Sequence, residues 1–261
     1  MKKIILLISI LSIITISSYA QLIDEKNVTV TMDLQPILQL NMSTPDQVDF
    51  VFDEIPEYYG GITKYAGTVL KVSASVSWDL YAVGTSQNGN FWDVQMEYNS
   101  TGGGNAINEL PLSALELRQY GANNYAPTAT GTYVDYSTPF QTVTYPVVIP
   151  LAGAGQNSIY HSANPYTAPA VDEKYIQGQK GTAILVGEGA PGGSYLTEGG
   201  NTSDYYFTID YRILPGLPAI FPCAGLNDNT SEDIVTANAA GNYAAPGVYS
   251  MNVKYVLLED Q

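Results

Sequence analysis

Residues 68–82 read TVLKVSASVSWDLYA, and this stretch decides the fold class. From Leu70 to Ala82 every second residue is apolar, and Lys, Ser, Asp and Tyr fill the positions between. A period of two is typical of a β-strand, in which successive side chains point to opposite faces. We therefore predict one half-buried strand here, with Trp78 as its anchor in the core.

Similar alternation recurs along the chain and predicts further strands at residues 28–42, 48–52, 92–98, 142–149, 182–186, 205–214 and 249–257. A turn is expected at residues 58–61. Residues 113–120 fit either a two-turn helix or a strand with Leu115 and Leu117 pointing inward. Many short strands with almost no helix predict an all-β fold, a single antiparallel β-sandwich of Ig-like or pilin-like type. Long loop insertions are expected near residues 120–138 and 152–181.

The composition excludes several classes of protein. The chain has 261 residues, of which 45% are hydrophobic, and this share argues against intrinsic disorder. Ten Lys and Arg against 25 Asp and Glu, a net charge of −15, would repel nucleic acid. A single Cys cannot form a disulfide framework within the chain.

The first twenty residues resemble a secretory signal peptide. Lys2 and Lys3 precede a mostly apolar run at residues 4–16, and small residues lead up to Ala20. This run is short for crossing about 30 Å of hydrocarbon, so we expect no membrane insertion. We predict a signal peptide at residues 1–20 and one domain at residues 21–261. The protein is then secreted, at a bacterial cell surface or outside the cell.

Three stretches carry a family resemblance. They are the alternating residues 28–42, residues 68–80 with their W-x-L tripeptide, and residues 246–257, which begin with Pro-Gly and continue as an alternating strand. In these features the chain resembles bacterial surface β-sandwich proteins, namely fimbrial or pilus subunits and WxL-type surface domains. The resemblance implies a sandwich architecture and a role at the cell surface, and it transfers no binding residues.

The first functional hypothesis is a non-enzymatic structural subunit of a surface filament, pilus or adhesive layer. Its partners would be copies of itself or other subunits of the surface structure. Residues 28–42 could leave their own sandwich and complete that of a neighbour by strand exchange. Alternatively, this segment is the first strand of its own fold. Pro36 cannot donate a ladder hydrogen bond, so we expect an edge, a bulge or a break there, with residues 28–42 forming either two collinear strands or one strand that switches sheets. The assembly strand would present its apolar side chains at Val28, Val30, Met32, Leu34, Leu38 and Leu40.

The second hypothesis is a carbohydrate-binding module that uses tyrosine-rich loops. Aromatic rings with a polar tip suit sugar stacking, and they suit the pinning of long loops to a sandwich equally well. The predicted ligand loop contains Tyr120, Tyr125, Tyr133 and Tyr136.

Catalytic and metal-binding groups are few. His161 is the only His and falls in a predicted loop, and Cys223 has no basic neighbour to activate its thiol. We therefore expect no enzymatic activity and no cofactor. Calcium is the one ion that an oxygen-rich loop suits, at Asp228, Glu232 and Asp233. The EF-hand spacing is absent, however, and we favour a solvated acidic loop over a calcium site.

Overall fold

The computed structural model describes residues 26, 28–98, 106–107, 110–121, 135–140, 157–169, 174–178, 193–198, 205–213, 243–244 and 246–259. The chain divides into two units, Met1–Gln35 and Pro36–Gln261. The described part of the second unit contains twelve strands and three short helical segments, which confirms the predicted all-β, sandwich-like fold. The expected strands at residues 142–149 and 182–186 lie outside the described residues.

The first of the two main sheets, called sheet A, has the strand order β1–β2–β9–β6, and β8 also pairs with β2. All of its pairings are antiparallel. The strands are β1 (Leu38–Met42), β2 (Thr63–Ala74), β6 (Leu115–Gln119), β8 (Gly193–Ser194) and β9 (Tyr206–Ile213).

The second main sheet, called sheet B, has the order β12–β3–β7. Its strands are β3 (Trp78–Thr85), β7 (Tyr175–Gln177) and β12 (Asn252–Glu259). Two small pairings complete the described strands, β4 (Asp93–Glu97) with β11 (Gly247–Ser250), and β5 (Ala106–Ile107) with β10 (Tyr243–Ala244). Strand β7 lies within residues 152–181, where the sequence predicted only loop.

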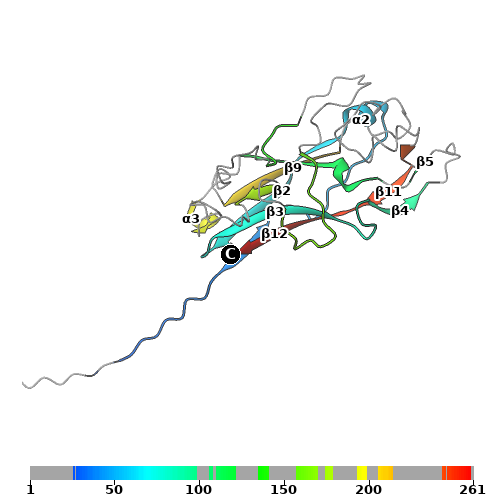
Figure 1. Cartoon of the computed structure of the whole chain (residues 1–261). Helices are drawn as coiled ribbons and strands as arrows, with labels where there is room; N and C mark the ends of the chain where they lie inside the picture. Colours follow the sequence, from blue (N-terminus) through cyan, green and yellow to red (C-terminus); the bar gives the residue numbers. More distant parts are fainter. Residues whose placement is uncertain are drawn as a thin grey trace, which may run out of the picture. The chain divides into compact units, whose positions relative to one another are not determined.

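Residues 68–82 form two strands in different sheets, so the prediction of one continuous strand is wrong. β2 ends at Ala74, and β3 begins at Trp78 after a three-residue bend. Because β2 belongs to sheet A and β3 to sheet B, this bend carries the chain from one layer to the other (Figure 1). The apolar alternation continues through the bend because both strands turn one face toward the same core.

The core lies between the two sheets. Its largest residue is Trp78, which is fully buried and contacts the rings of Tyr205 and Phe207 at centroid distances of 6.0 and 6.1 Å. The prediction that Trp78 anchors the core is confirmed. Leu115 and Leu117 are also buried, on strand β6, so the strand interpretation of residues 113–120 is the correct one. The remaining core residues include Leu70, Val72, Leu80, Ile176, Ile209 and Ile213.

A chain of hydroxyl groups crosses this core. The Tyr211 hydroxyl lies 2.6 Å from the Thr68 hydroxyl and 2.5 Å from the Tyr255 hydroxyl. These contacts satisfy polar atoms that burial would otherwise leave without water. Burial raises the pKa of Tyr211, and it raises the pKa of Tyr255 well above its ordinary value.

Three local predictions need correction. Residues 48–52 form no strand, although Val48, Phe50 and Phe52 pack against the core. The expected turn at residues 58–61 overlaps helix α2 (Ile55–Gly60), whose Glu57 side chain accepts hydrogen bonds from the backbone at its N-terminus. Another short helix, α3 (Tyr195–Glu198), follows β8, and a 3-10 turn η1 (Leu112–Ala114) precedes β6.

The third correction concerns residues 92–98, which we expected to turn Trp92, Val94, Met96 and Tyr98 inward. Trp92 packs against the core and its indole nitrogen donates to the Pro111 carbonyl at 3.1 Å. Met96 and Tyr98 are exposed instead. In the described structure β4 pairs only with β11, and this two-stranded ribbon leaves both side chains uncovered.

Candidate functional site at the edge and outer face of sheet A

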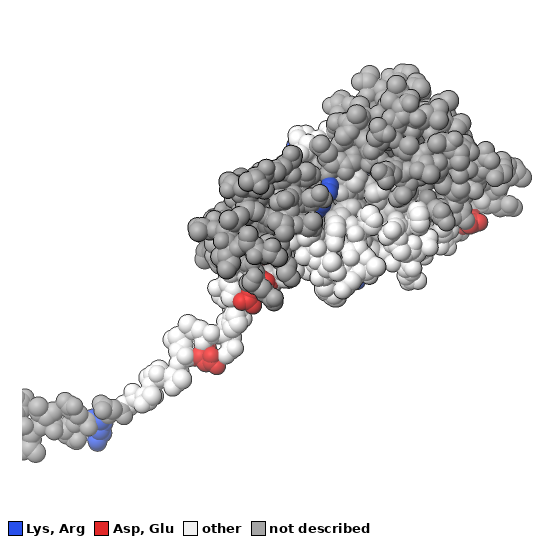
Figure 2. Space-filling model, viewed as in Figure 1, with Lys and Arg blue, Asp and Glu red and all other residues white. Residues whose placement is uncertain are grey.

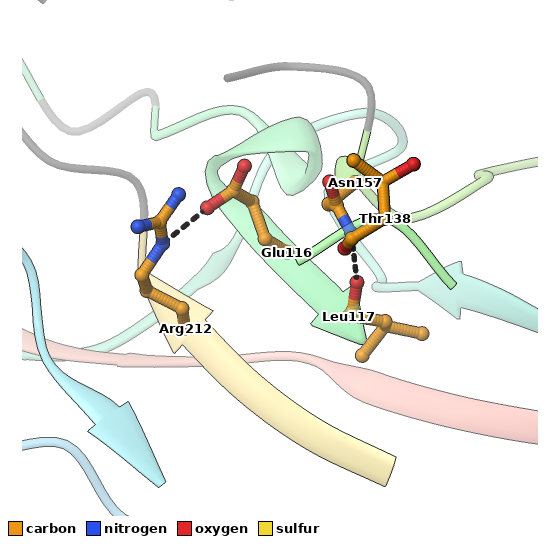
Figure 3. Close-up of polar contacts among 5 residues, drawn as sticks. All are labelled: Glu116, Leu117, Thr138, Asn157 and Arg212. Atoms are coloured by element: carbon orange, nitrogen blue, oxygen red, sulfur yellow. Dashed lines mark hydrogen bonds and ion pairs between the residues drawn. The ribbon is translucent and has the colours of Figure 1, made fainter. Parts of the chain in front are cut away.

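One edge of sheet A is closed by the polypeptide itself. The side-chain amide of Asn157 donates to the carbonyls of Leu117 and Thr138, at 2.9 and 2.8 Å (Figure 3). The backbone N–H of Ile159 donates to the Leu115 carbonyl at 2.8 Å. At the other end of β6, the N–H of Gln119 donates to the carbonyl of Tyr136, also at 2.8 Å. The backbone groups of β6 that face away from β9 therefore already form hydrogen bonds and are not available to a further strand.

The opposite edge, strand β1, is open among the described residues. The N–H of Ser75 donates to the Ile37 carbonyl, and the N–H of Ser43 donates to the Val69 carbonyl. In an antiparallel pair the bonded residues alternate, so odd-numbered residues 37–43 direct their backbone groups toward β2. The backbone groups of Leu38, Leu40 and Met42 therefore point away from β2. No described residue forms a hydrogen bond with them.

The two edge strands of sheet B are better protected than β1. Strand β12, at the edge of sheet B, carries Lys254 and Glu259, and charged side chains oppose the addition of a further strand. Strand β7, at the other edge, has only three residues. The sequence of β1 is LQLNM, without any charge. Its apolar side chains remain partly accessible, since Leu38 is 37% and Met42 45% exposed.

The predicted assembly strand breaks near Pro36, as one of the options for this proline had it. Strand is found only at Leu38–Met42, so both predictions for residues 28–42, two collinear strands or one strand that switches sheets, are wrong. Leu38 and Leu40 pair with Ala74 and Val72 of the same chain, as the first-strand alternative predicted. Residues 28–37 are not strand. β2 ends at Ala74, and the chain then continues into sheet B. β2 therefore provides no further residues with which the residues before Ile37 could pair.

Residues 28–35, called the N-terminal segment below, keep the apolar side chains exposed. The exposed fractions are 85% for Val28 and Val30, 77% for Met32 and 82% for Leu34. Asp33 is the one charged residue among them, and Figure 2 shows the segment as almost uncharged. Four large apolar side chains at period two, exposed to water, are the pattern of a strand that lacks a partner.

The predicted tyrosine loop separates into unlike residues. Tyr120 is about half exposed, whereas Tyr136 is fully buried and its hydroxyl accepts the N–H of Tyr160 at 2.9 Å. Tyr136 is therefore a core residue, and its assignment to a ligand-binding loop is wrong. Tyr125 and Tyr133 lie outside the described residues, as do Asp228, Glu232 and Asp233 of the predicted calcium loop.

The sequence analysis did not identify a strip of charged residues on the outer face of sheet A. It consists of Glu116 and Arg118 on β6 and of Asp210 and Arg212 on β9, where Glu116 lies opposite Arg212 and Arg118 opposite Asp210. The chain contains only two arginines, and both are in this strip. The signal was present in LELRQ and IDYRI, where charged residues alternate with apolar ones on two strands.

The strip is held by one buried ion pair and by cation–π contacts. The Arg212 Nε atom donates to Glu116 Oε2 at 2.6 Å, and both side chains are at most 5% exposed (Figure 3). The Arg212 guanidinium lies 4.6 Å from the ring centroid of Phe140, and that of Arg118 lies 5.0 Å from the ring of Tyr120. Buried charges of opposite sign on facing strands fix the pairing of β6 with β9.

Comparison with known proteins leaves the chain without an assigned family. No protein-family model matches the sequence, and no curated protein matches it. Within the described ranges, His, Cys, Asp and Glu side chains form no cluster of three or more that could hold a metal ion. The same part of the chain has no helix with the length and apolar character needed to cross a membrane.

Proposed function

We propose that the chain is a secreted, non-enzymatic structural subunit of a bacterial surface filament, pilus or adhesive layer. Its N-terminal segment would leave the subunit and add as a strand to the open β1 edge of a second copy. One observation carries the proposal: within the described residues, an uncharged sheet edge that pairs with no further strand and an alternating apolar segment that is not strand occur in the same chain. Strand addition would satisfy the outward backbone groups of Leu38, Leu40 and Met42.

The asymmetry between the two edges of sheet A supports this proposal. Hydrogen bonds from Asn157 and Ile159 occupy the β6 edge, so that edge offers little to a neighbour. Natural proteins guard exposed edges with charges, proline or covering loops, and within the described residues β1 has only Pro36, two residues before its start. An uncharged edge is expected where pairing with another chain is part of function, and among the described edges of the two main sheets β1 is the one of this kind.

A pair of deletions tests the proposal. Removing residues 21–35 takes away the donor segment and leaves β1 in place, whereas removing residues 21–42 also deletes β1. We expect the first variant to remain folded but to lose assembly, measured by light scattering after size exclusion and by negative-stain microscopy. The second variant should lose thermal stability as well. Filaments of unchanged amount and length from the first variant would contradict the proposal.

A further inference from the structure

The inference begins with a strained bulge in β2. Lys64 lies opposite Tyr211 and Thr68 opposite Ile209, so residues 65–67 bulge out across from the single residue Asp210. Ala66 has a φ of 49°, a left-handed conformation that its β-carbon disfavours. The Ala66 N–H donates to Asp210 Oδ1 at 2.7 Å. Bulges of this kind redirect side chains and are frequent beside functional sites.

The sheet register places the bulge on β2 and the end of β6 on either side of Asp210, and each of these two positions carries an exposed tyrosine. Tyr65, directly before Ala66, is 71% exposed, and Tyr120 is 49% exposed. A hydrogen bond to Asp210 raises the pKa of Tyr120, and the nearby Tyr65 hydroxyl raises it further. The Arg118 guanidinium rests on the Tyr120 ring at 5.0 Å. Asp210 is fully buried, and its hydrogen bond from the Ala66 N–H holds the bulge that carries Tyr65.

We propose that Tyr65 and Tyr120 form a stacking site for a neutral glycan, with Arg118 as a hydrogen-bond donor. Tyrosine rings offer an apolar face to the C–H groups of a sugar and a hydroxyl to its polar edge. The Tyr120 ring is already held by its contact with Arg118, so it loses little entropy on binding. The net charge of −15 disfavours acidic polymers, so the ligand class is the uncharged hexoses and N-acetylhexosamines.

A binding experiment on the full chain tests this site. The probe is an array of neutral oligosaccharides, followed by titration calorimetry with the best binder. Tyr65→Ala and Tyr120→Ala should each weaken binding about tenfold, which corresponds to the loss of one aromatic contact. Tyr166→Ala is the matched control, because Tyr166 is 76% exposed and lies in another segment, residues 157–169. Its binding should equal that of the unchanged chain.

One further variant, compared with Tyr65→Ala, separates stacking from folding. Tyr65→Phe keeps the ring and should retain most of the affinity, while the exposed position of Tyr65 leaves folding unaffected in either variant. Near-ultraviolet circular dichroism checks that each variant is folded. The proposal is overturned by an array without any neutral binder, by binding restricted to acidic glycans, or by Tyr65→Ala and Tyr120→Ala variants that bind as tightly as Tyr166→Ala.

Discussion

Two neighbouring proline substitutions in β1 should affect different properties of the protein, one its folding stability and the other its assembly. Asn41 is one of the residues whose backbone bonds to β2, whereas the N–H of Met42 points to the open edge. Proline lacks this N–H, and strands accept it only where the missing donor would face solvent. Asn41→Pro should therefore damage the subunit itself. Met42→Pro should leave the subunit folded and prevent a second copy from adding a strand.

The magnitudes follow from the bonds that each change removes. Asn41→Pro loses one ladder hydrogen bond, about 1 kcal/mol, and leaves the Lys71 carbonyl without its donor, about 1–3 kcal/mol. Met42→Pro removes a donor that has no partner in the described structure, together with a side chain that is already 45% exposed, so we expect a loss of about 1 kcal/mol. For a domain of this size the Asn41→Pro loss lowers Tm by roughly 5–15 °C.

Thermal unfolding followed by circular dichroism measures the first effect, and light scattering of concentrated samples measures the second. The expected result is a stable, non-assembling Met42→Pro variant and a destabilised Asn41→Pro variant. Equal losses of stability in both, or a larger loss for Met42→Pro, would show that the alternation assigned to β1 is wrong. A stable Met42→Pro variant that assembles as the unchanged chain does would refute β1 as the acceptor edge.

Three further predictions concern stability. Glu116→Gln should cost about 3–5 kcal/mol in urea unfolding because it leaves the buried Arg212 charge without its counter-ion, while the double variant Glu116→Leu, Arg212→Met should lie close to the unchanged chain. Asp210→Ala should cost about 1–3 kcal/mol by the same measurement, since the N–H of Ala66 loses its acceptor. Burial raises the pKa of Tyr81 to about 12 from 10.0, so its contribution to stability is complete below pH 10 and disappears as the pH rises toward 12. The Tyr81→Phe variant should lose less stability between pH 10 and pH 12 than the unchanged chain. A pH series in which the Tm values of the variant and of the unchanged chain fall in parallel would contradict the role given to Tyr81.

The sequence predicts local periodicity well and sheet membership poorly. Alternation located β9 and the inward faces of β2 and β3, because it depends only on neighbouring residues. It could not locate the change of sheet at residues 75–77, where the period of two continues while the hydrogen-bonding partners change. The neighbour of β2 in sheet A is β9, which lies more than 130 residues later in the chain. A pairing over this distance cannot be read from a local pattern.

The candidate site shows the same division. The exposed apolar pattern of the N-terminal segment was visible in the sequence, whereas the closing of the β6 edge by Asn157 depends on contacts across 19 and 40 residues. Glu116 and Arg212 are 96 residues apart, so their pairing cannot be seen from spacing. Tyr120 and Tyr136 cannot be told apart from the sequence, because both are tyrosines in the same loop-like region. In the folded chain the Tyr120 ring is half exposed and the Tyr136 ring lies in the core.

The unequal edges of sheet A have a consequence for symmetry. Contact between an open edge and an unlike segment is heterologous, because the two copies contribute different surfaces. Two copies that exchange segments reciprocally form a closed dimer, whereas contacts made in one direction only continue from copy to copy unless the rotation closes a ring. A polymer of this kind has two chemically different ends, one showing a vacant β1 edge and the other a free N-terminal segment. Capping either end with a matching fragment would stop its growth from that end alone.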